Sequence, residues 1–570
     1  MNRRHCASLF VGVATLAALA TAGAQSSQSA APTLLIVNGR VYTGNGVLQE
    51  AVAVAGNQIV RVGTTREIEA LRAASTQVVD AHGGAVVPGF IDSHVHLMLG
   101  GESLDQVNLR GTRTPDEARE RVRSFAAAHP GTSWIRGANG YGRLTRVDLD
   151  AILHDRPAFI VSGDVHSLLA NSRALAAANV TKATSNPPNG IIDRDNQTDE
   201  PTGILREAAQ GLVTNAVPRP THEDRLHSLR AAIDEAHRAG VTSIVNIGGP
   251  DDIAIFDEAR RKGDLTLRIY SALWVAPGGG DSGFPSSLNV TDADLDAFDR
   301  IRARYPETPV LKTGAIKIML DGVIESRTAA MLAPYGDTPS SGTPNFPAER
   351  LNHIVTTMDR RGWQIITHAL GDRAVRMALD AYERASTENP AAARGRRHRI
   401  EHIEASSGDD IPRFAKLGVI ASLQPAHARG MLNPNPTGGR IVSIGAERHA
   451  SGWPWKSILD AGGHVIFGSD WPVASLDPTS SFYVPLTRAG RPGVPDQRLS
   501  MNAVIDAYTK TAAWAEFDDR QKGTIEAGKL ADLVVLSKDV FADPPAKADD
   551  VTVDVTVFDG RVVYSRSRSQ

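Results

Sequence analysis

The sequence has very little cysteine, no long block of one charge and no internal repeat. Its single cysteine, Cys6, lies near the N-terminus, so the rest of the chain can form no disulfide. The formal net charge is only −3 over 570 residues, and nothing in it points to a nucleic-acid partner. Hydrophobic residues make up 42% and charged residues 22% of the chain, as in an ordinary soluble globular protein.

A predicted export signal occupies residues 1–24. Arg3-Arg4 precede the apolar run 9–20, and Ala22-Gly23-Ala24 offers small residues to a signal peptidase. The run is too short and too rich in alanine for a transmembrane helix. We therefore expect a periplasmic or secreted protein with no membrane span after cleavage. The paired arginines leave the twin-arginine route open beside the general one, although their flanking residues fit it poorly.

Both ends of the remaining chain have a β-rich pattern. Residues 32–84 and 520–566 contain short runs of β-branched and apolar residues, with turn signals at Asn-Gly and Gly-Asn steps. The same pattern does not recur between them. The simplest arrangement is one composite β-sandwich built from both termini, with a catalytic domain at residues 85–519.

The middle of the chain alternates short apolar strands with amphipathic helices, which is typical of a parallel sheet with crossover helices. Eight strands are predicted, at residues 85–93, 241–246, 265–270, 315–320, 363–368, 398–403, 419–424 and 464–470. Eight strands close a TIM-like (β/α)8 barrel, and the fold class is therefore α/β. The gap after the first strand is too long for one helix, so residues 101–225 are predicted to be an inserted subdomain over the barrel mouth.

Chemically active side chains recur at the carboxyl ends of these strands, where barrel enzymes place their catalytic groups. His94 and His96 share one face of a strand, because the side-chain period is two, and together they can reach one cation. A lone histidine at a strand end is more often structural, and Asp470 could merely cap a helix. Six such groups at matching ends nevertheless indicate a shared site: His94, His96, Lys317, His368, His402 and Asp470.

Lys317 interrupts an apolar strand, where an uncompensated ammonium group would be costly to bury. One interpretation is a salt bridge to Asp321 or Asp470. The other is reaction with carbon dioxide to give a carbamate, whose two oxygens can bridge a pair of divalent metals. The residues alone leave both open.

Several motifs together resemble the amidohydrolase superfamily of metal-dependent hydrolases over nearly the whole chain after the signal. The resemblance is narrower to the amidohydrolase-3 (YtcJ-like) branch, which includes N-substituted formamide deformylase. The segments that carry it are Pro88-Gly89-Phe90-Ile91-Asp92-Ser93-His94-Val95-His96, His166-Ser167 with Asn171-Ser172, Gly203-Ile204-Leu205 with Glu207, Asp321-Gly322, His368-Ala369-Leu370-Gly371-Asp372-Arg373-Ala374, Gly468-Ser469-Asp470-Trp471-Pro472 and residues 523–535.

The resemblance implies metal ligation by the six strand-end groups, with Lys317 carboxylated and bridging. Similar enzymes most often carry zinc, here expected as a pair, and other divalent ions also occur in them. It also suggests substrate contacts for His166 and Asn171, although local bonding at a helix start explains these two equally well. Weaker substrate-binding candidates are Glu207, Asp372, Arg373 and Trp471; Asp372 and Arg373 could instead be an exposed ion pair that opens a helix.

The predicted reaction is hydrolysis of a non-peptide amide, N-formyl or N-acyl C–N bond by metal-activated hydroxide, with Asp470 as general base. The alternatives are a lactone, ester, carbonate or phosphoester hydrolase on the same site, or an exported metal- or ligand-binding protein without turnover. Base deamination is disfavoured, because Ala369-Leu370-Gly371-Asp372 follows His368 where adenosine-type deaminases carry His-Ala-Gly-Glu. The expected partner is a small-molecule substrate, and the commonest oligomer, a homodimer, is the expected assembly.

Overall fold

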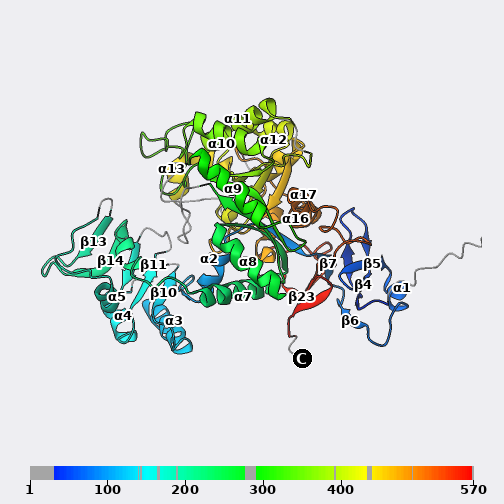
Figure 1. The fold of residues 1–570 in the computed structure, drawn as a ribbon, viewed down its shortest axis with the longest axis horizontal. Coiled ribbons are helices and arrows are strands. Elements are labelled where there is room, and N and C mark those ends of the chain that lie inside the picture. Colours follow the sequence, from blue (N-terminus) through cyan, green and yellow to red (C-terminus); the bar gives the residue numbers. More distant parts are fainter. Residues whose placement is uncertain are drawn as a thin grey trace, which may run out of the picture.

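A computed structural model describes residues 31–138, 140, 144–162, 167–187, 190–275, 290–390, 393–432, 439–490 and 492–567. The predicted export signal lies outside these residues. The centre of the molecule is an eight-stranded parallel sheet curled into a barrel, which confirms the predicted (β/α)8 fold (Figure 1). Its strands, in spatial and chain order, are β8 (Phe90–Val95), β15 (Val241–Gly248), β16 (Arg268–Trp274), β17 (Leu311–Met319), β18 (Gln364–Ala369), β19 (Arg399–His402), β20 (Ile420–Leu423) and β21 (His464–Phe467).

Helices cover the outside of the barrel and bury one apolar face each against the strands. Their starts follow from the sequence: Thr221 and Thr291 form capping boxes with Asp224 and Asp294, which satisfy the first free N–H groups. The helices of this layer are α7 (His222–Arg238), α8 (Pro250–Lys262), α9 (Asp292–Arg304), α10 (Ala348–Arg360), α11 (Asp372–Glu388), α12 (Ile411–Leu417), α14 (Trp455–Asp460), α16 (Met501–Tyr508) and α17 (Lys510–Ala515). Within the described part of the chain, no helix is long and apolar enough to cross a membrane.

The run at residues 85–93 is divided between two sheets. β7 (Ala85–Pro88) pairs with strands of the terminal β-sandwich, whereas β8 begins the barrel. Gly89 joins them, and a Cβ at this position would lie 2.1 Å from Oγ1 of Thr242, so no larger residue fits. One continuous apolar run therefore serves two sheets, because a single glycine lets the backbone pass close to the neighbouring strand.

The barrel closes between β8 and β21, where the residues after β21 replace a regular strand ladder. The carboxylate of Asp92 accepts hydrogen bonds from the backbone N–H groups of Ser469 (2.9 Å) and His94 (3.1 Å). The N–H of Asp470 donates to the carbonyl of His94 at 2.8 Å, and that of His96 donates to Trp471 at 3.0 Å. These bonds fix the ends of the first and last strands against each other.

A β-sandwich built from both termini lies next to the barrel, at the end where β7 leads into β8. One sheet has the order β5-β4-β1-β6 and the other β24-β23-β22-β7-β2-β3, and one apolar cluster lies between them. The strands are β1 (Leu34–Val37), β2 (Arg40–Tyr42), β3 (Leu48–Gln49), β4 (Ala51–Ala55), β5 (Gln58–Gly63), β6 (Gln77–Asp80), β22 (Leu533–Leu536), β23 (Val553–Phe558) and β24 (Arg561–Ser565), with helix α1 (Thr65–Glu69) beside them.

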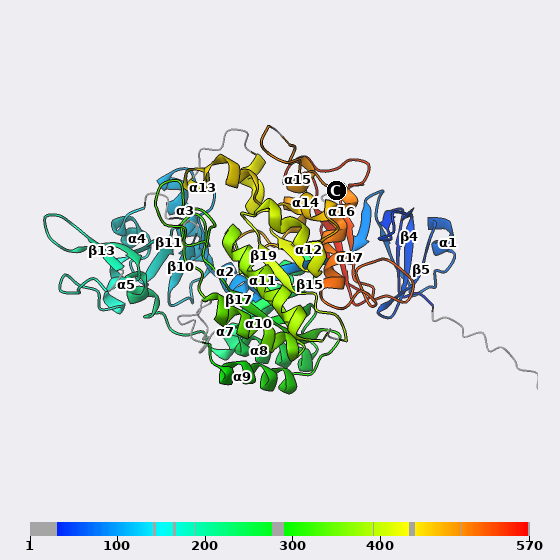
Figure 2. The ribbon, with the colours of Figure 1, turned by 90° about the horizontal axis from the view of Figure 1, so that it is seen from above.

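The segment between β8 and β15 begins with α2 (Leu97–Leu104), which packs on α7, and then forms a separate six-stranded sheet of order β13-β14-β12-β11-β10-β9. Figures 1 and 2 show this insert on the side of the barrel away from the sandwich. Its elements are β9 (Val107–Asn108), α3 (Pro115–Ala128), β10 (Ile135–Ala138), α4 (Arg146–Ile152), β11 (Ala158–Val161), β12 (Ser167–Ala170), α5 (Ser172–Ala177), β13 (Gly190–Arg194), β14 (Pro201–Glu207) and α6 (Gln210–Thr214).

A buried ion pair joins the barrel to the sandwich. Arg268 on β16 donates to both oxygens of Asp532, at 2.6 and 3.1 Å, and also to Asp559 at 2.9 Å. The side chains of Arg268 and Asp532 are each 4% exposed. Removal of one partner from such a pair leaves an uncompensated buried charge.

We therefore expect Arg268→Met to lower the free energy of unfolding by about 3–5 kcal/mol, measured by urea titration. The matched control is Arg261→Met on α8, whose arginine is 64% exposed and pairs with Asp257. Its loss should change stability by no more than about 1 kcal/mol. Equal effects of the two substitutions would show that the pair does not hold the two domains together.

Candidate active site

The six strand-end groups of the sequence analysis line one cavity of about 940 Å³ at the carboxyl ends of the barrel strands. His94 lies on β8, Lys317 on β17, His368 on β18 and His402 at the end of β19, whereas Asp470 follows β21. His96 is the first residue after β8 and caps α2. Ligand atoms of His94, His402 and Asp470, all buried, lie within 4.8 Å of one another.

His94 is oriented by a carboxylate that the sequence analysis missed. Its Nδ1 lies 2.5 Å from Oε2 of Glu401, and the other carboxylate oxygen accepts a hydrogen bond from Nε of Arg399 at 2.9 Å. All three side chains are no more than 1% exposed. A carboxylate at Nδ1 keeps the proton on that nitrogen and leaves the Nε2 lone pair free for a metal. The signal in the sequence was a charged Arg-x-Glu pair inside an apolar strand.

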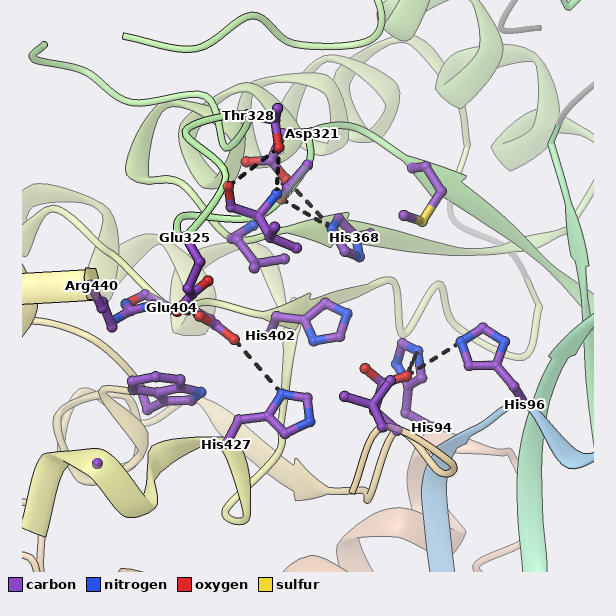
Figure 3. Close-up of a pocket in the computed structure, with 18 of the residues that line it drawn as sticks. His94, His96, Asp321, Glu325, Thr328, His368, His402, Glu404, His427 and Arg440 are labelled. Carbon is purple, nitrogen blue, oxygen red and sulfur yellow. Dashed lines mark hydrogen bonds and ion pairs between the residues drawn. The ribbon is translucent and has the colours of Figure 1, made fainter. Parts of the chain in front are cut away.

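His96 is fixed in the same manner by a backbone carbonyl. Its Nδ1 lies 3.2 Å from the carbonyl oxygen of Ile247, and its ring stacks on Trp274 with centroids 5.7 Å apart. Its Nε2 lies 3.3 Å from Oδ1 of Asp470, and Nε2 of His94 lies 3.5 Å from the same oxygen. The two histidines of the first-strand motif thus converge on one carboxylate (Figure 3).

Lys317 is 1% exposed, and its Nζ lies 3.1 Å from Nε2 of His94. Burial lowers the pKa of this amine to about 8, although the carboxylates of Glu401 and Asp470 act in the opposite direction. Among the described residues it forms no ion pair with a carboxylate, so neither Asp321 nor Asp470 provides the salt bridge that was one interpretation of the sequence.

His368 lies beside His402, with ring centroids 4.5 Å apart, but it is not among the three residues whose ligand atoms converge. Its Nε2 is directed at the carbonyl of Gly322 (3.4 Å) and at Oδ1 of Asp321 (3.9 Å). Asp321 itself accepts backbone N–H groups from residues 330, 370 and 371. The Asp321-Gly322 motif therefore organises the two loops around His368.

The charge states of these groups suit a cation. Burial lowers the pKa of His94 to about 4 and of His368 to about 3, and it lowers that of His402 well below its ordinary value. Burial alone would raise the pKa of Asp470, but the neighbouring imidazoles hold it well below the ordinary range. Neutral imidazoles and an ionised carboxylate are the donor set that zinc and similar divalent metals prefer.

Next to His402, the cavity wall carries a polar cluster that could not be singled out from the sequence. Oε2 of Glu404 accepts from Nη1 of Arg440 at 2.5 Å, and Oε1 lies 3.7 Å from Nδ1 of His427. Burial alone would lower the pKa of His427, but Glu404, Asp470 and Glu325 raise it. Glu404 follows β19, whereas His427 and Arg440 lie in helices after β20, so no local spacing in the sequence brings the three together.

The weaker substrate-binding candidates fall outside the described cavity lining. His166 and the side chain of Glu207 lie outside the described residues. Asn171 caps α5 inside the insert: it accepts from the N–H groups of Ala158 and Ala174, both at 2.9 Å. Asp372 accepts from the N–H of residue 332, Arg373 is exposed, and Trp471 packs against α2 at residue 100. Among the described residues from α2 to α6, only Leu99 of α2 lines the cavity.

The chain is similar over most of its length to several known proteins. A model of the amidohydrolase family matches residues 77–564. Protein LONG AFTER FAR-RED 3 of Arabidopsis thaliana is 30% identical over 93% of this chain and 91% of its own length. N-substituted formamide deformylase of Arthrobacter pascens is 28% identical over 94% and 99%. The crystal structure of an uncharacterized metal-dependent hydrolase from Pyrococcus furiosus aligns with a TM-score of 0.69 at 25% identity, over 89% and 99%.

Glu401→Gln tests the orientation of His94. The amide can present its NH2 group to Nδ1, which favours the wrong tautomer, and it removes a charge beside Arg399. We expect metal affinity to fall about 10- to 100-fold, measured by competition with a chromogenic chelator. Glu388→Gln, on the surface of α11 with its side chain 40% exposed, is the control. Unchanged affinity in Glu401→Gln would contradict this role of Glu401.

Proposed function

The chain belongs to the amidohydrolase family, and on that premise we propose that it hydrolyses a non-peptide C–N bond, in an N-formyl or N-acyl amide, with a divalent metal. The observation that carries the proposal is the convergence of His94, His402 and Asp470 on one buried point of the cavity. The similarity to N-substituted formamide deformylase over nearly the whole chain supports an amide as the target.

The proposed metal is a pair of zinc ions, because zinc prefers histidine and carboxylate ligands. The proposed ligands are the six predicted groups: His94, His96, Lys317, His368, His402 and Asp470. When bound, such a metal polarises the substrate carbonyl and lowers the pKa of water towards neutrality. Glu401 and the carbonyl of Ile247 hold His94 and His96 with Nε2 towards the cavity. The site is therefore largely preformed by this chain's own hydrogen bonds.

Lys317 is proposed to carry a carbamate derived from carbon dioxide. A neutral amine adds to the carbon of CO2, an N–C bond forms and one proton is released. Burial favours the neutral amine, because it lowers the pKa of Lys317 to about 8. The resulting anion has two oxygens and could bridge two metals as a carboxylate does.

Asp470 is proposed as the general base. Its carboxylate takes a proton from the attacking water as the water oxygen adds to the carbonyl carbon. It then delivers that proton to the amide nitrogen as the C–N bond breaks. The products are a carboxylic acid, formic acid in the case of a formamide, and an amine.

The cellular setting is also part of the proposal. The pattern of residues 1–24 supports export, so we place the enzyme in the periplasm or outside the cell. The lack of cysteine after this segment suits an oxidising compartment. A homodimer remains the expected assembly.

Asp470→Asn should lower kcat by about 10²- to 10⁴-fold, because it removes the proton acceptor, while most of the metal stays bound through the remaining ligands. Activity and metal content are measured on the same sample, the latter by elemental analysis. Asp460→Asn, on α14 with a side chain 61% exposed, is the control. Full activity in Asp470→Asn would rule out the assignment.

A chelator experiment tests the reaction class. The metal-loaded protein is assayed with N-formyl and N-acyl amines, a lactone and a phosphotriester, before and after dialysis against chelator and after zinc is restored. We expect hydrolysis of the amides that disappears with the metal and returns with it. Turnover of the lactone or phosphotriester alone would replace the proposed reaction, and metal binding without any turnover would indicate a binding protein.

A further inference from the structure

His427 lies on the cavity wall next to the candidate metal ligands. It begins the short 3-10 helix His427–Leu432, which follows β20, and its ring is parallel to that of His402, with centroids 6.2 Å apart and planes within 6°. Figure 3 shows the ring of His427 below that of His402, with a dashed line from it to Glu404. His427 therefore lies beside the candidate ligand cluster.

The carboxylate of Glu404 faces Nδ1 of His427 and favours a proton on that nitrogen. Oε1 of Glu404 lies 3.7 Å from Nδ1, and Glu404 is held from the other side by Arg440, which donates to its Oε2 at 2.5 Å and also to its backbone carbonyl. A carboxylate that faces Nδ1 favours the tautomer with its proton there. In the neutral ring, Nε2 is then a hydrogen-bond acceptor.

This acceptor has no partner in the described structure. Nε2 of His427 is buried, and no group among the described residues hydrogen-bonds to it. A buried polar atom without a partner costs free energy, and a ligand that supplies the missing group regains it. Met431 and Trp453 line the cavity as well, and a donor on a bound substrate can supply the missing hydrogen bond.

We propose that Nε2 of His427 accepts a hydrogen bond from the N–H of the scissile amide, so that the enzyme selects amides with at least one hydrogen on the nitrogen. This inference rests on the proposed amide hydrolysis and names its substrate class. The N–H is the one donor of an amide group, whereas an ester of the same shape has none. His427 thus distinguishes C–N from C–O substrates at a site whose ligand cluster could serve both.

The test pairs two substrates of the same shape, N-butylformamide and butyl formate, with variants of His427. For the amide, His427→Phe should lower kcat/KM about 10- to 100-fold, because the N–H loses its acceptor on entering the cavity. For the ester, the same substitution should change kcat/KM less than about threefold. His427→Gln, whose side-chain carbonyl can accept the N–H, should recover part of the amide activity.

A control variant and the ester substrate distinguish failure of this inference from failure of the proposed function. His227→Phe, on the exposed face of α7 with a side chain 62% exposed, should alter neither substrate. An equal loss for amide and ester in His427→Phe would mean that the residue acts through the shape of the cavity, and it would overturn the inference while leaving amide hydrolysis in place. If the wild-type enzyme hydrolyses the ester but no amide, the proposed function fails, and the inference fails with it.

Discussion

The rest of the site depends on one buried hydrogen-bonded series of ionisable side chains, which runs from Arg399 through Glu401 to His94. Three ionisable groups with almost no exposure stand in the middle of the barrel. Each would be costly alone, and they are tolerated because each hydrogen-bonds the next. Arg399 also donates to the carbonyl of Ser93 at 2.5 Å and to Ser422 at 3.1 Å. The same series therefore orients a candidate ligand and ties β19 to β8 and β20.

The sequence predicts the architecture well, because periodicity and strand ends are local signals. All eight barrel strands overlap their predicted positions, and the family suggested by the motifs is the one that the comparisons show. One feature could not be predicted. The division of residues 85–93 between two sheets depends on the close approach of Thr242 to Gly89, which is a tertiary contact.

The candidate site likewise contains residues that the sequence predicts and residues that it does not. Groups at strand ends could be predicted, because a parallel barrel brings all its carboxyl ends to one rim. Glu401 could not be singled out, because its role depends on contact with a histidine 307 residues away. Glu404 lies in the loop after β19, and His427 and Arg440 lie in helices that follow β20. Their positions in the cavity depend on connections whose paths no periodicity fixes. The orientation of His368 towards Gly322 is likewise a matter of loop packing rather than of the strand that carries it.

The pairing of β7 with β22 constrains the order in which the chain can acquire its structure. Val86 is opposite Val535, so a strand near the beginning of the chain can pair only after a strand near the end has been synthesised. Arg268, near the middle of the chain, likewise gains its ion-pair partners Asp532 and Asp559 only when the C-terminal segment is present. During synthesis from the N-terminus, the barrel strands can assemble before the C-terminal strands that cover β7 and Arg268 have been made. The last fifty or so residues therefore complete the molecule, and a chain shortened at its C-terminus would leave a strand edge and a guanidinium group without cover.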